Sequence, residues 1–223
     1  MEMIDLINHT NIDLTQTTSL KGTLRIGASP VISQAILPDV LTRLHAKYPD
    51  MRLELTTAPS SDIARLLKNH KVDVGCSELD NLPSSEAFMQ DELVLLASST
   101  HPLARKRSSS ILDLQNTHWI LPDTEDPSRL LIDQSLKQYG VQVQPTIMSS
   151  PESIKQAVLS GLGIAIMSRH SCKQELAKGD LTILDYRVAP IKRAFYTGTR
   201  SKTNEVQAFL SELKAYCRLW QVN

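Results

Sequence analysis

Short strand-like segments alternate with longer helix-like segments along most of this chain. Residues 23–27 predict a strand, and the apolar spacing of residues 31–48 predicts a helix. The same order follows at residues 51–57, a predicted strand, and at residues 61–69, a predicted helix. Because strands that alternate with helices of this length build βαβ units, we expect an α/β fold with a largely parallel sheet.

The alternation continues along the chain in two similar halves. Further strands are predicted at residues 72–76, 93–97, 163–167, 181–184 and 194–197, and further helices at 130–139, 154–159 and 204–219. A strand followed by a loop, a serine and a helix occurs in both halves. We therefore expect two Rossmann-like lobes, with lobe I over residues 21–97 and 200–223 and lobe II over residues 98–199, joined by crossing segments near residues 97–100 and 197–200.

The composition excludes several classes of function. The chain has 24 basic and 24 acidic residues, whereas a protein that binds nucleic acid through its own surface usually has a basic excess. Three cysteines without a CxxC pair predict reduced thiols, with neither a disulfide framework nor a zinc site. Residues 1–18 are too polar for a signal peptide, and no apolar stretch is long enough to span a bilayer. The longest basic run, residues 105–107, predicts a solvated loop.

The motifs of catalysis and nucleotide binding are absent from the sequence. It has no GxxxxGK[ST], GxSxG or HExxH pattern, no GxGxxG after the first strand, and its six histidines lack metal-ligand spacing. One SxxK pattern at residues 211–214 lies in a predicted helix without partner residues, which favours a chance match. Cys76 ends an apolar strand, where a buried structural thiol is expected. We therefore expect no enzyme, no cofactor and no metal.

Serines stand at four predicted helix starts, each directly after a predicted strand. They are Ser29 before Pro30, the pair Ser60 and Ser61, Ser128 after Pro127, and Ser150 before Pro151. Each serine alone is explained as a helix N-cap. Together they indicate more, because the helix starts of a doubly wound sheet lie along the carboxyl edge of the strands, where ligands bind. Two such lobes facing each other form a cleft of hydroxyls and backbone amides, which is a recognition site without catalytic groups.

An ordered series of short motifs extends from Gly22 to about Leu213. It contains GTLRIGAS at 22–29, LP at 37–38, YP at 48–49, VDVG at 72–75, HPLA at 101–104 and SPESIKQAVLSGLGIAI at 150–166. Through this series the chain resembles the effector-binding domain of LysR-type transcriptional regulators. The resemblance implies a type 2 periplasmic-binding-protein-like fold, with a small-molecule cleft between two α/β lobes and antiparallel side-by-side dimers.

The resemblance also implies parts that we do not expect in this sequence. Family members have an N-terminal winged helix-turn-helix and a linker helix, and residues 1–20 resemble the remnant of that linker. The implied partners are a small-molecule effector, a second copy of the chain in a homodimer (a tetramer at full length), and promoter DNA through the missing winged helix-turn-helix only. The implied location is the cytoplasm, without membrane contact.

The family's effector-contacting positions are carried over one at a time onto this sequence. The implied effector-binding residues are Ser29, Pro30, Val31, Ser61, Asp126, Ser128, Ser149, Ser150, Gly163 and Ile164. The loop over residues 124–127 departs from the usual glycine-rich version, since it holds Glu125 and Asp126. These two carboxylates oppose an anionic effector unless they point to solvent. Residues 153–166 resemble most the members tied to sulfur or small inorganic-anion metabolism, so an anionic effector stays one option.

The leading hypothesis is therefore a ligand-sensing regulatory domain that controls DNA binding and transcription by the full-length protein. A free-standing solute-binding protein of the same fold stays open as an alternative, although the polar start of the chain disfavours it. A thiol-based redox sensor acting through Cys76 or Cys172 also stays open. Thiol-sensing members of the family have a cysteine in the loop around residues 124–128, and this sequence has none there.

Overall fold

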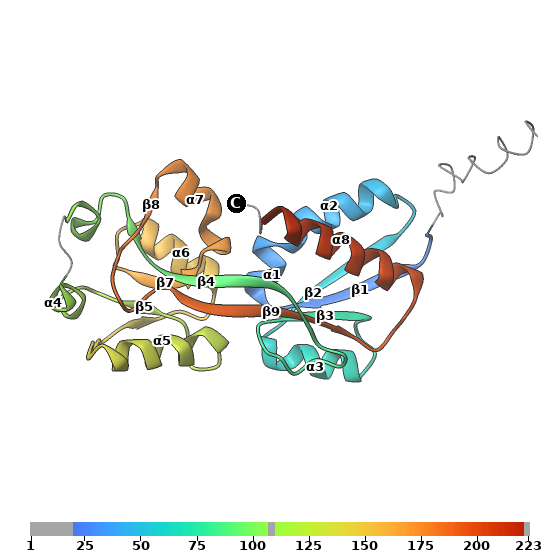
Figure 1. Cartoon of the computed structure of the whole chain (residues 1–223), viewed down its shortest axis with the longest axis horizontal. Coiled ribbons are helices and arrows are strands. Elements are labelled where there is room, and N and C mark those ends of the chain that lie inside the picture. Colours follow the sequence, from blue (N-terminus) through green and yellow to red (C-terminus); the bar gives the residue numbers. More distant parts are fainter. Residues whose placement is uncertain (1–19, 107–109, 221–223) are drawn as a thin grey trace, which may run out of the picture.

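Two lobes lie side by side and are joined by two long strands (Figure 1). The computed structural model describes residues 20–106 and 110–220. The joining strands are β4 (Glu86–Ser98) and β9 (Ile191–Thr199), which pair antiparallel and run from one lobe into the other. The predicted linker remnant, apart from Leu20, lies outside the described residues, as does the end of the predicted basic loop.

Lobe I is built on three parallel strands. Strand β1 (Thr23–Ala28) pairs in parallel with β2 (Arg52–Thr57) on one side and with β3 (Val74–Ser77) on the other. The helices of this lobe are α1 (Pro30–Ala35), α2 (Leu37–Lys47), α3 (Ser60–Lys68) and α8 (Asn204–Trp220). Strand β3 also pairs antiparallel with β9, because β9 returns from lobe II in the opposite direction. The sheet is therefore mixed rather than largely parallel.

The single helix predicted over residues 31–48 is in fact two helices. Helix α1 ends at Ala35, Ile36 has a non-helical φ of −121°, and α2 begins at Leu37. The cause is Pro38, which has no backbone N–H to donate and whose ring would clash with the carbonyl four residues earlier in a continuous helix. The break allows each short helix to turn its own buried face to the core of lobe I.

Lobe II combines one parallel pair with antiparallel strands. Strand β5 (Ile120–Leu121) pairs in parallel with β6 (Thr146–Ile147). The far half of β4 pairs antiparallel with β7 (Ala165–Ser168) and β8 (Leu181–Ile183). The helices of this lobe are α4 (Ile111–Gln115), α5 (Pro127–Gln138), α6 (Pro151–Leu159) and α7 (Lys173–Lys178), with short 3-10 helices at Pro102–Arg105 and His170–Cys172. Gly140 follows α5 with a φ of 68°, the left-handed conformation that glycine often adopts just after a helix.

The hydrophobic clusters divide the two joining strands between the lobes. Phe88 and Met89 of β4 and Phe195 of β9 belong to the core of lobe I. Residues 93–97 of β4 belong instead to the two clusters of lobe II. The division of the chain into lobes stays a proposal, and these clusters favour boundaries in the middle of β4 and β9 over the expected ones at residues 97 and 200.

Gly163 allows the approach to β7 to pack directly on the backbone of His118. The Ile164 amide donates to the His118 carbonyl over 2.9 Å, and Ile164 pairs with Trp119 in an isolated parallel bridge. A Cβ at Gly163 would lie only 2.3 Å from the carbonyl oxygen of His118. Because the crowded neighbour is backbone rather than a flexible side chain, the clash cannot be relieved by a rotamer change.

We expect Gly163→Ala to lower the free energy of unfolding by about 1–3 kcal/mol, the usual range for overpacking a core. Urea-induced unfolding followed by circular dichroism measures this change. Gly22→Ala is the matched control, because a Cβ there would meet only the side chain of Glu205, which can turn away. Equal losses of stability in the two variants would contradict the close backbone packing at Gly163.

Candidate functional site

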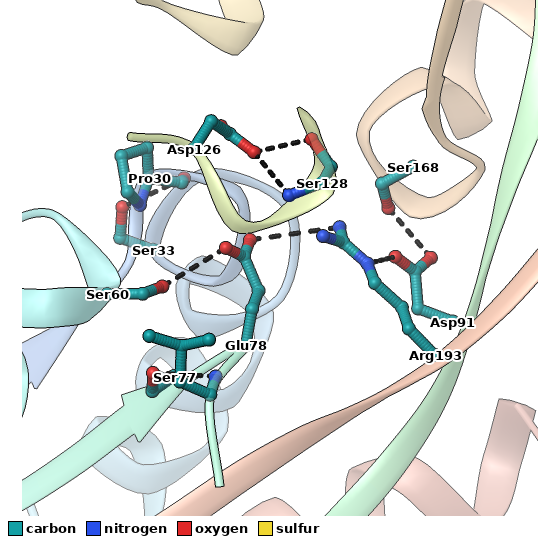
Figure 2. Close-up of polar contacts among 11 residues, drawn as sticks. Pro30, Ser33, Ser60, Ser77, Glu78, Asp91, Asp126, Ser128, Ser168 and Arg193 are labelled. Carbon is teal, nitrogen blue, oxygen red and sulfur yellow. Dashed lines mark hydrogen bonds and ion pairs between the residues drawn. The ribbon is translucent and has the colours of Figure 1, made fainter. Parts of the chain in front are cut away.

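Polar side chains from both lobes gather where the lobes meet, and we call them the interlobe polar cluster. Figure 2 shows them pointing toward one another from the end of β3, the start of α3, the start of α5 and the joining strands. The cluster consists of Ser60, Glu78, Asp91, Asp126, Ser128, Ser168 and Arg193. The site therefore lies at the carboxyl end of β3, the edge of a sheet where helix starts and ligands are expected.

A continuous series of polar contacts crosses the cluster. Ser168 Oγ donates to Asp91 Oδ1 over 2.8 Å, and Arg193 Nε donates to Asp91 Oδ2 over 2.7 Å. On its other side, Arg193 Nη2 lies 3.7 Å from Glu78 Oε1, and Ser60 Oγ donates to Glu78 Oε2 over 3.1 Å. The side chains of Arg193, Glu78 and Asp91 are 7%, 3% and 0% exposed, so these charges depend on one another rather than on water.

The register of the joining strands places the central ion pair. Asp91 of β4 stands directly opposite Arg193 of β9 in the antiparallel pair. The Arg193 guanidinium also lies 5.1 Å above the ring of Phe195, which is fully buried in lobe I. Removing one member of such a buried pair typically costs about 3–5 kcal/mol, because the other charge is left without compensation. The pair therefore holds the two strands in register at the boundary between the lobes.

The surroundings of Glu78 disfavour the charged form of its carboxyl group. Burial raises the pKa of its carboxyl group; the positive charge of Arg193 opposes this shift and the negative charge of Asp126 adds to it. Asp126 belongs to lobe II, where it is the N-cap of α5. A carboxylate of lobe II thus acts directly on a carboxylate of lobe I.

The hydrogen bonds of Asp126 are local to its own loop. Its Oδ1 accepts from the Ser128 amide over 2.8 Å and also accepts from the Ser128 hydroxyl. Both bonds end on the same oxygen, which leaves Oδ2 for another partner. Glu125, its neighbour, is exposed. The two carboxylates of this loop therefore differ: Glu125 is exposed, whereas Asp126 is half-buried and bonded within its own loop.

Three polar atoms in or beside the cluster are buried without a hydrogen-bond partner among the described residues. They are Ser29 Oγ, in a residue with no exposed surface, Glu78 Oε1 and Arg193 Nη1. Ser29 stands at the N-cap position of α1, but its side chain makes no cap hydrogen bond. The hydroxyls beside it are satisfied, since Thr57 donates to Ser33 and Ser33 donates to the Pro30 carbonyl. Buried polar groups nearly always have a partner, so these atoms indicate a place for a ligand or water.

The structure brings together some of the implied effector residues. Pro30, Asp126 and Ser128 lie near the cluster in Figure 2, and Ser29 directly precedes Pro30 in the chain. Val31 is buried in the core of lobe I. The contact of these residues with an effector stays a prediction.

Ser61 does not face the junction, and its neighbour Ser60 does. Helix α3 begins at Ser60, which is 2% exposed and bonded to Glu78, whereas Ser61 is exposed. Consecutive side chains of a helix differ in direction by about 100°. A helix start predicted one residue too late therefore selects a side chain on a different face of the helix. Ser61 as an effector-binding residue stays a prediction, and Ser60 is the serine of this helix start that contacts the cluster.

The implied residues of lobe II after position 140 have structural roles. Gly163 and Ile164 pack against residues 118–120, and Ile164 is fully buried in a core cluster of lobe II. These are packing contacts of lobe II, and a part of Gly163 and Ile164 in effector binding stays a prediction. Ser150 is the N-cap of α6, with Oγ accepting from the Ser153 amide over 3.4 Å, and Ser149 is exposed.

Sequence reasoning named Asp126 but missed three other charged residues of the cluster, Glu78, Asp91 and Arg193. Glu78 follows the strand predicted at residues 72–76, so the rule for carboxyl edges could have found it. Asp91 stands in a polar stretch just before the strand predicted at residues 93–97, which is a weaker signal. Its pairing with Arg193 joins positions 102 residues apart and is set by strand register alone.

A second set of contacts joins the lobes beside a hollow of about 180 Å³ between α1–α2 and α6–α7. Lys173 Nζ of lobe II donates to Asp39 Oδ2 of lobe I over 2.9 Å, and Tyr216 Oη donates to the same oxygen over 3.0 Å. The hydrogen bond from Lys173 lowers the pKa of Asp39. The Lys173–Asp39 contact joins the lobes at the surface, away from the buried charges, and Tyr216 of lobe I holds the Asp39 carboxylate in place.

Other kinds of site find no support in the part of the chain that the structure describes. No group of three or more histidine, cysteine, aspartate or glutamate side chains there could hold a metal ion. None of the described helices combines the length and the apolar character needed to cross a membrane.

The three thiols are poorly placed for redox sensing. Cys76, Cys172 and Cys217 are all buried and unbonded to each other. Burial raises the pKa of Cys76 and of Cys172 to about 12, and that of Cys217 to about 11. Because the thiolate is the reactive form, such thiols are inert at neutral pH.

We expect none of the three thiols of the native chain to react with Ellman's reagent within minutes at pH 8, and all three to react in 6 M guanidinium. The absorbance of the released thionitrobenzoate measures the number of reactive thiols in the native and in the denatured chain. The denatured sample is the internal control for intact thiols. Rapid reaction of Cys76 or Cys172 in the native chain would revive the redox hypothesis.

Comparison with known proteins shows a match to one family over almost the whole chain. The profile of the LysR substrate binding domain matches residues 17–218. The transcriptional regulator CysL of Bacillus subtilis is 29% identical over 203 residues, which are 88% of this chain and 68% of CysL. The regulator CbbR of Rhodospirillum rubrum is 32% identical over 208 residues, 88% of this chain and 67% of CbbR. A further regulator, YeiE of Escherichia coli, is 32% identical over 167 residues, 72% of this chain and 56% of YeiE. The chain thus spans roughly two thirds or less of these relatives.

Solved structures share the fold. The regulatory domain of CcmR from Synechocystis PCC6803, in complex with 2-PG, superposes with a TM-score of 0.76 at 28% identity, covering 88% of this chain and 98% of that one. The cofactor-binding domain of the Cbl transcriptional regulator gives 0.77 at 25% identity, covering 89% and 90%. The two lobes joined by crossing strands are therefore the type 2 periplasmic-binding-protein-like fold of such domains.

Proposed function

Because the chain belongs to the family of LysR substrate binding domains, we propose that its interlobe polar cluster binds a small-molecule effector and that this binding controls transcription by a longer protein. The observation that supports the site is the pair of buried, unpartnered atoms at the junction, Ser29 Oγ and Arg193 Nη1. An effector that accepts from Arg193 and bonds to Ser29 would satisfy both. The complex of the similar CcmR domain with 2-PG supports a small ligand for a domain of this fold.

The position of the cluster suggests how binding becomes a signal. Its residues come from lobe I, from lobe II and from both joining strands, so an effector there contacts every part that moves when the lobes change their relative orientation. A ligand shifts such an equilibrium only as far as it binds one arrangement better than the other. Contacts to Ser29 on one lobe and to the start of α5 on the other give that preference to the closed arrangement.

We assign the cluster to recognition and not to catalysis. Its carboxylates and guanidinium are engaged with each other and with serine hydroxyls in buried contacts. These contacts hold the charges in place, whereas a nucleophilic reaction needs a hydroxyl or thiol activated by a neighbouring base. The matching relatives are transcriptional regulators, in agreement with this assignment.

The partners of the site follow from the family. We propose a second copy of the chain as a partner in a homodimer, with a tetramer for the full-length protein. Promoter DNA would be bound by a winged helix-turn-helix outside this chain, since the chain itself has a formal charge of zero. The protein would then act in the cytoplasm, where that DNA is found.

We expect Ser29→Ala to weaken effector binding by about 3- to 10-fold, the value of one neutral hydrogen bond. An effector is first identified by a thermal-shift screen of small metabolites, since a ligand of the native state raises the melting temperature. Isothermal titration calorimetry then measures the dissociation constant of this effector for the parent and for each variant. Ser61→Ala is the matched control, because it removes an exposed hydroxyl of the neighbouring helix start.

The stability of Ser29→Ala without ligand gives a second prediction. Ser29→Ala removes a buried hydroxyl without a partner, so the ligand-free chain should be at least as stable as the parent. An effector whose affinity is equal in the parent, in Ser29→Ala and in Ser61→Ala does not bind at the junction, and the proposed site is then wrong.

A further inference from the structure

The charges of the interlobe polar cluster do not balance. It contains three carboxylates, those of Glu78, Asp91 and Asp126, and one guanidinium, that of Arg193. Arg193 Nε is hydrogen-bonded to Asp91, while Glu78 receives only the longer 3.7 Å contact from Nη2. Asp91 and Arg193 thus form a neutral pair, and Glu78 and Asp126 leave an excess of negative charge at the junction.

The two excess carboxylates come from opposite lobes. Glu78 follows β3 in lobe I, and Asp126 precedes α5 in lobe II; Figure 2 shows the two residues in the same cluster, with the Asp126 carboxylate turned toward Ser128. Each has an oxygen without a hydrogen bond. Glu78 uses Oε2 for Ser60 and has no hydrogen bond at the buried Oε1, and Asp126 uses only Oδ1 for its cap bonds. Carboxylate oxygens of this kind are the acceptors that an ammonium group binds.

A second observation, independent of the carboxylates, indicates a ligand at the lobe junction. The side chain of Arg193 is 7% exposed, yet its Nη1 has no hydrogen-bond partner among the described residues. A buried guanidinium N–H is a donor that needs an acceptor, which neither Glu78 nor Asp91 supplies to this nitrogen. The junction thus offers two acceptors to a cation and one donor to an acceptor.

We propose that the effector is an amino-acid-like zwitterion, whose ammonium group binds between Glu78 and Asp126 and whose carboxylate accepts from Arg193 Nη1. This inference rests on the proposed function and specifies its ligand. A simple anion fits poorly, because it would be brought beside two carboxylates, and the one cation of the cluster, Arg193, is already paired with Asp91.

Such a ligand also explains how binding closes the lobes. Without it, Glu78 and Asp126 repel each other across the junction and favour separation of the lobes. An ammonium group between them turns this repulsion into two charge-assisted hydrogen bonds, one to each lobe. The effector therefore binds the closed arrangement better than the open one, which is the requirement for a ligand-driven shift.

Three matched sets of probes test the ligand class in the thermal-shift assay. The first set contains free amino acids, the second the carboxylic acids that lack only the amino group, and the third the amines that lack only the carboxylate. We expect stabilisation by one or more amino acids, weaker stabilisation by the matching amine, and none by the matching acid. A screen in which no amino acid raises the melting temperature overturns the proposal.

Two single-charge variants test the placement of the ammonium group. Asp126→Asn retains an effective N-cap for α5 but removes the charge, and Glu125→Gln removes a charge from the exposed neighbour in the same loop. We expect Asp126→Asn to weaken binding of the amino-acid hit at least about 10-fold, and Glu125→Gln to leave it unchanged. Equal affinities in both variants overturn the proposal.

The melting temperature of the ligand-free chain is a further test, and it does not require that an effector has been identified. Relief of the repulsion with Glu78 should raise the melting temperature of Asp126→Asn by about 2–4 °C, while Glu125→Gln should show no such rise. A lower melting temperature in Asp126→Asn than in Glu125→Gln contradicts the repulsion.

The outcomes separate this inference from the proposed function. If a carboxylic acid without an amino group binds, and Ser29→Ala weakens it, the junction is an effector site but the zwitterion proposal is wrong. If an amino acid binds with the same affinity in Ser29→Ala, Asp126→Asn and the parent, it binds elsewhere and both proposals fail.

Discussion

The buried ion pair between Arg193 and Asp91 is the interaction on which the junction of the lobes depends. It joins the two crossing strands at the point where the core of lobe I gives way to the cores of lobe II. A buried charge without its partner costs several kcal/mol, so any shift of register between the strands is penalised at this position. The contact from Arg193 to Glu78 extends the same constraint to the end of β3.

That pairing also determines the chemistry left over for a ligand. One guanidinium cannot neutralise three carboxylates. Arg193 lies closer to Asp91 than to Glu78 and therefore mainly compensates the charge of Asp91. Glu78 and Asp126 remain, one on each lobe, and the unpartnered Nη1 of Arg193 remains beside them. A fold of this type accommodates many ligands, and the side chains of the site select among them. Here they favour a molecule that has both a positive and a negative group.

The sequence predicted the architecture better than it predicted the site. Alternating patterns located most strands and helices, and the ordered motifs indicated the family that the comparisons show. The differences in helix bounds have local physical causes: Pro38 breaks a helix that periodicity alone continues, and α3 begins one residue earlier than expected, so that Ser60 rather than Ser61 is its buried serine. Gly163 and Ile164, both predicted effector residues, pack against the backbone of His118.

By itself, the sequence determined the α/β alternation, the serines at the helix starts and the absence of catalytic motifs, because these depend on residues close together along the chain. Only the tertiary structure decided the charge balance of the site. Asp91 and Arg193 meet through strand register, Glu78 and Asp126 come to one cluster from different lobes, and Glu125 is exposed. Which charges are neutralised and which are left for a ligand depends on these long-range contacts, and no local pattern encodes them. Ser29 belongs to both accounts: its place after β1 is visible in the sequence, and its lack of a partner is visible only in the fold.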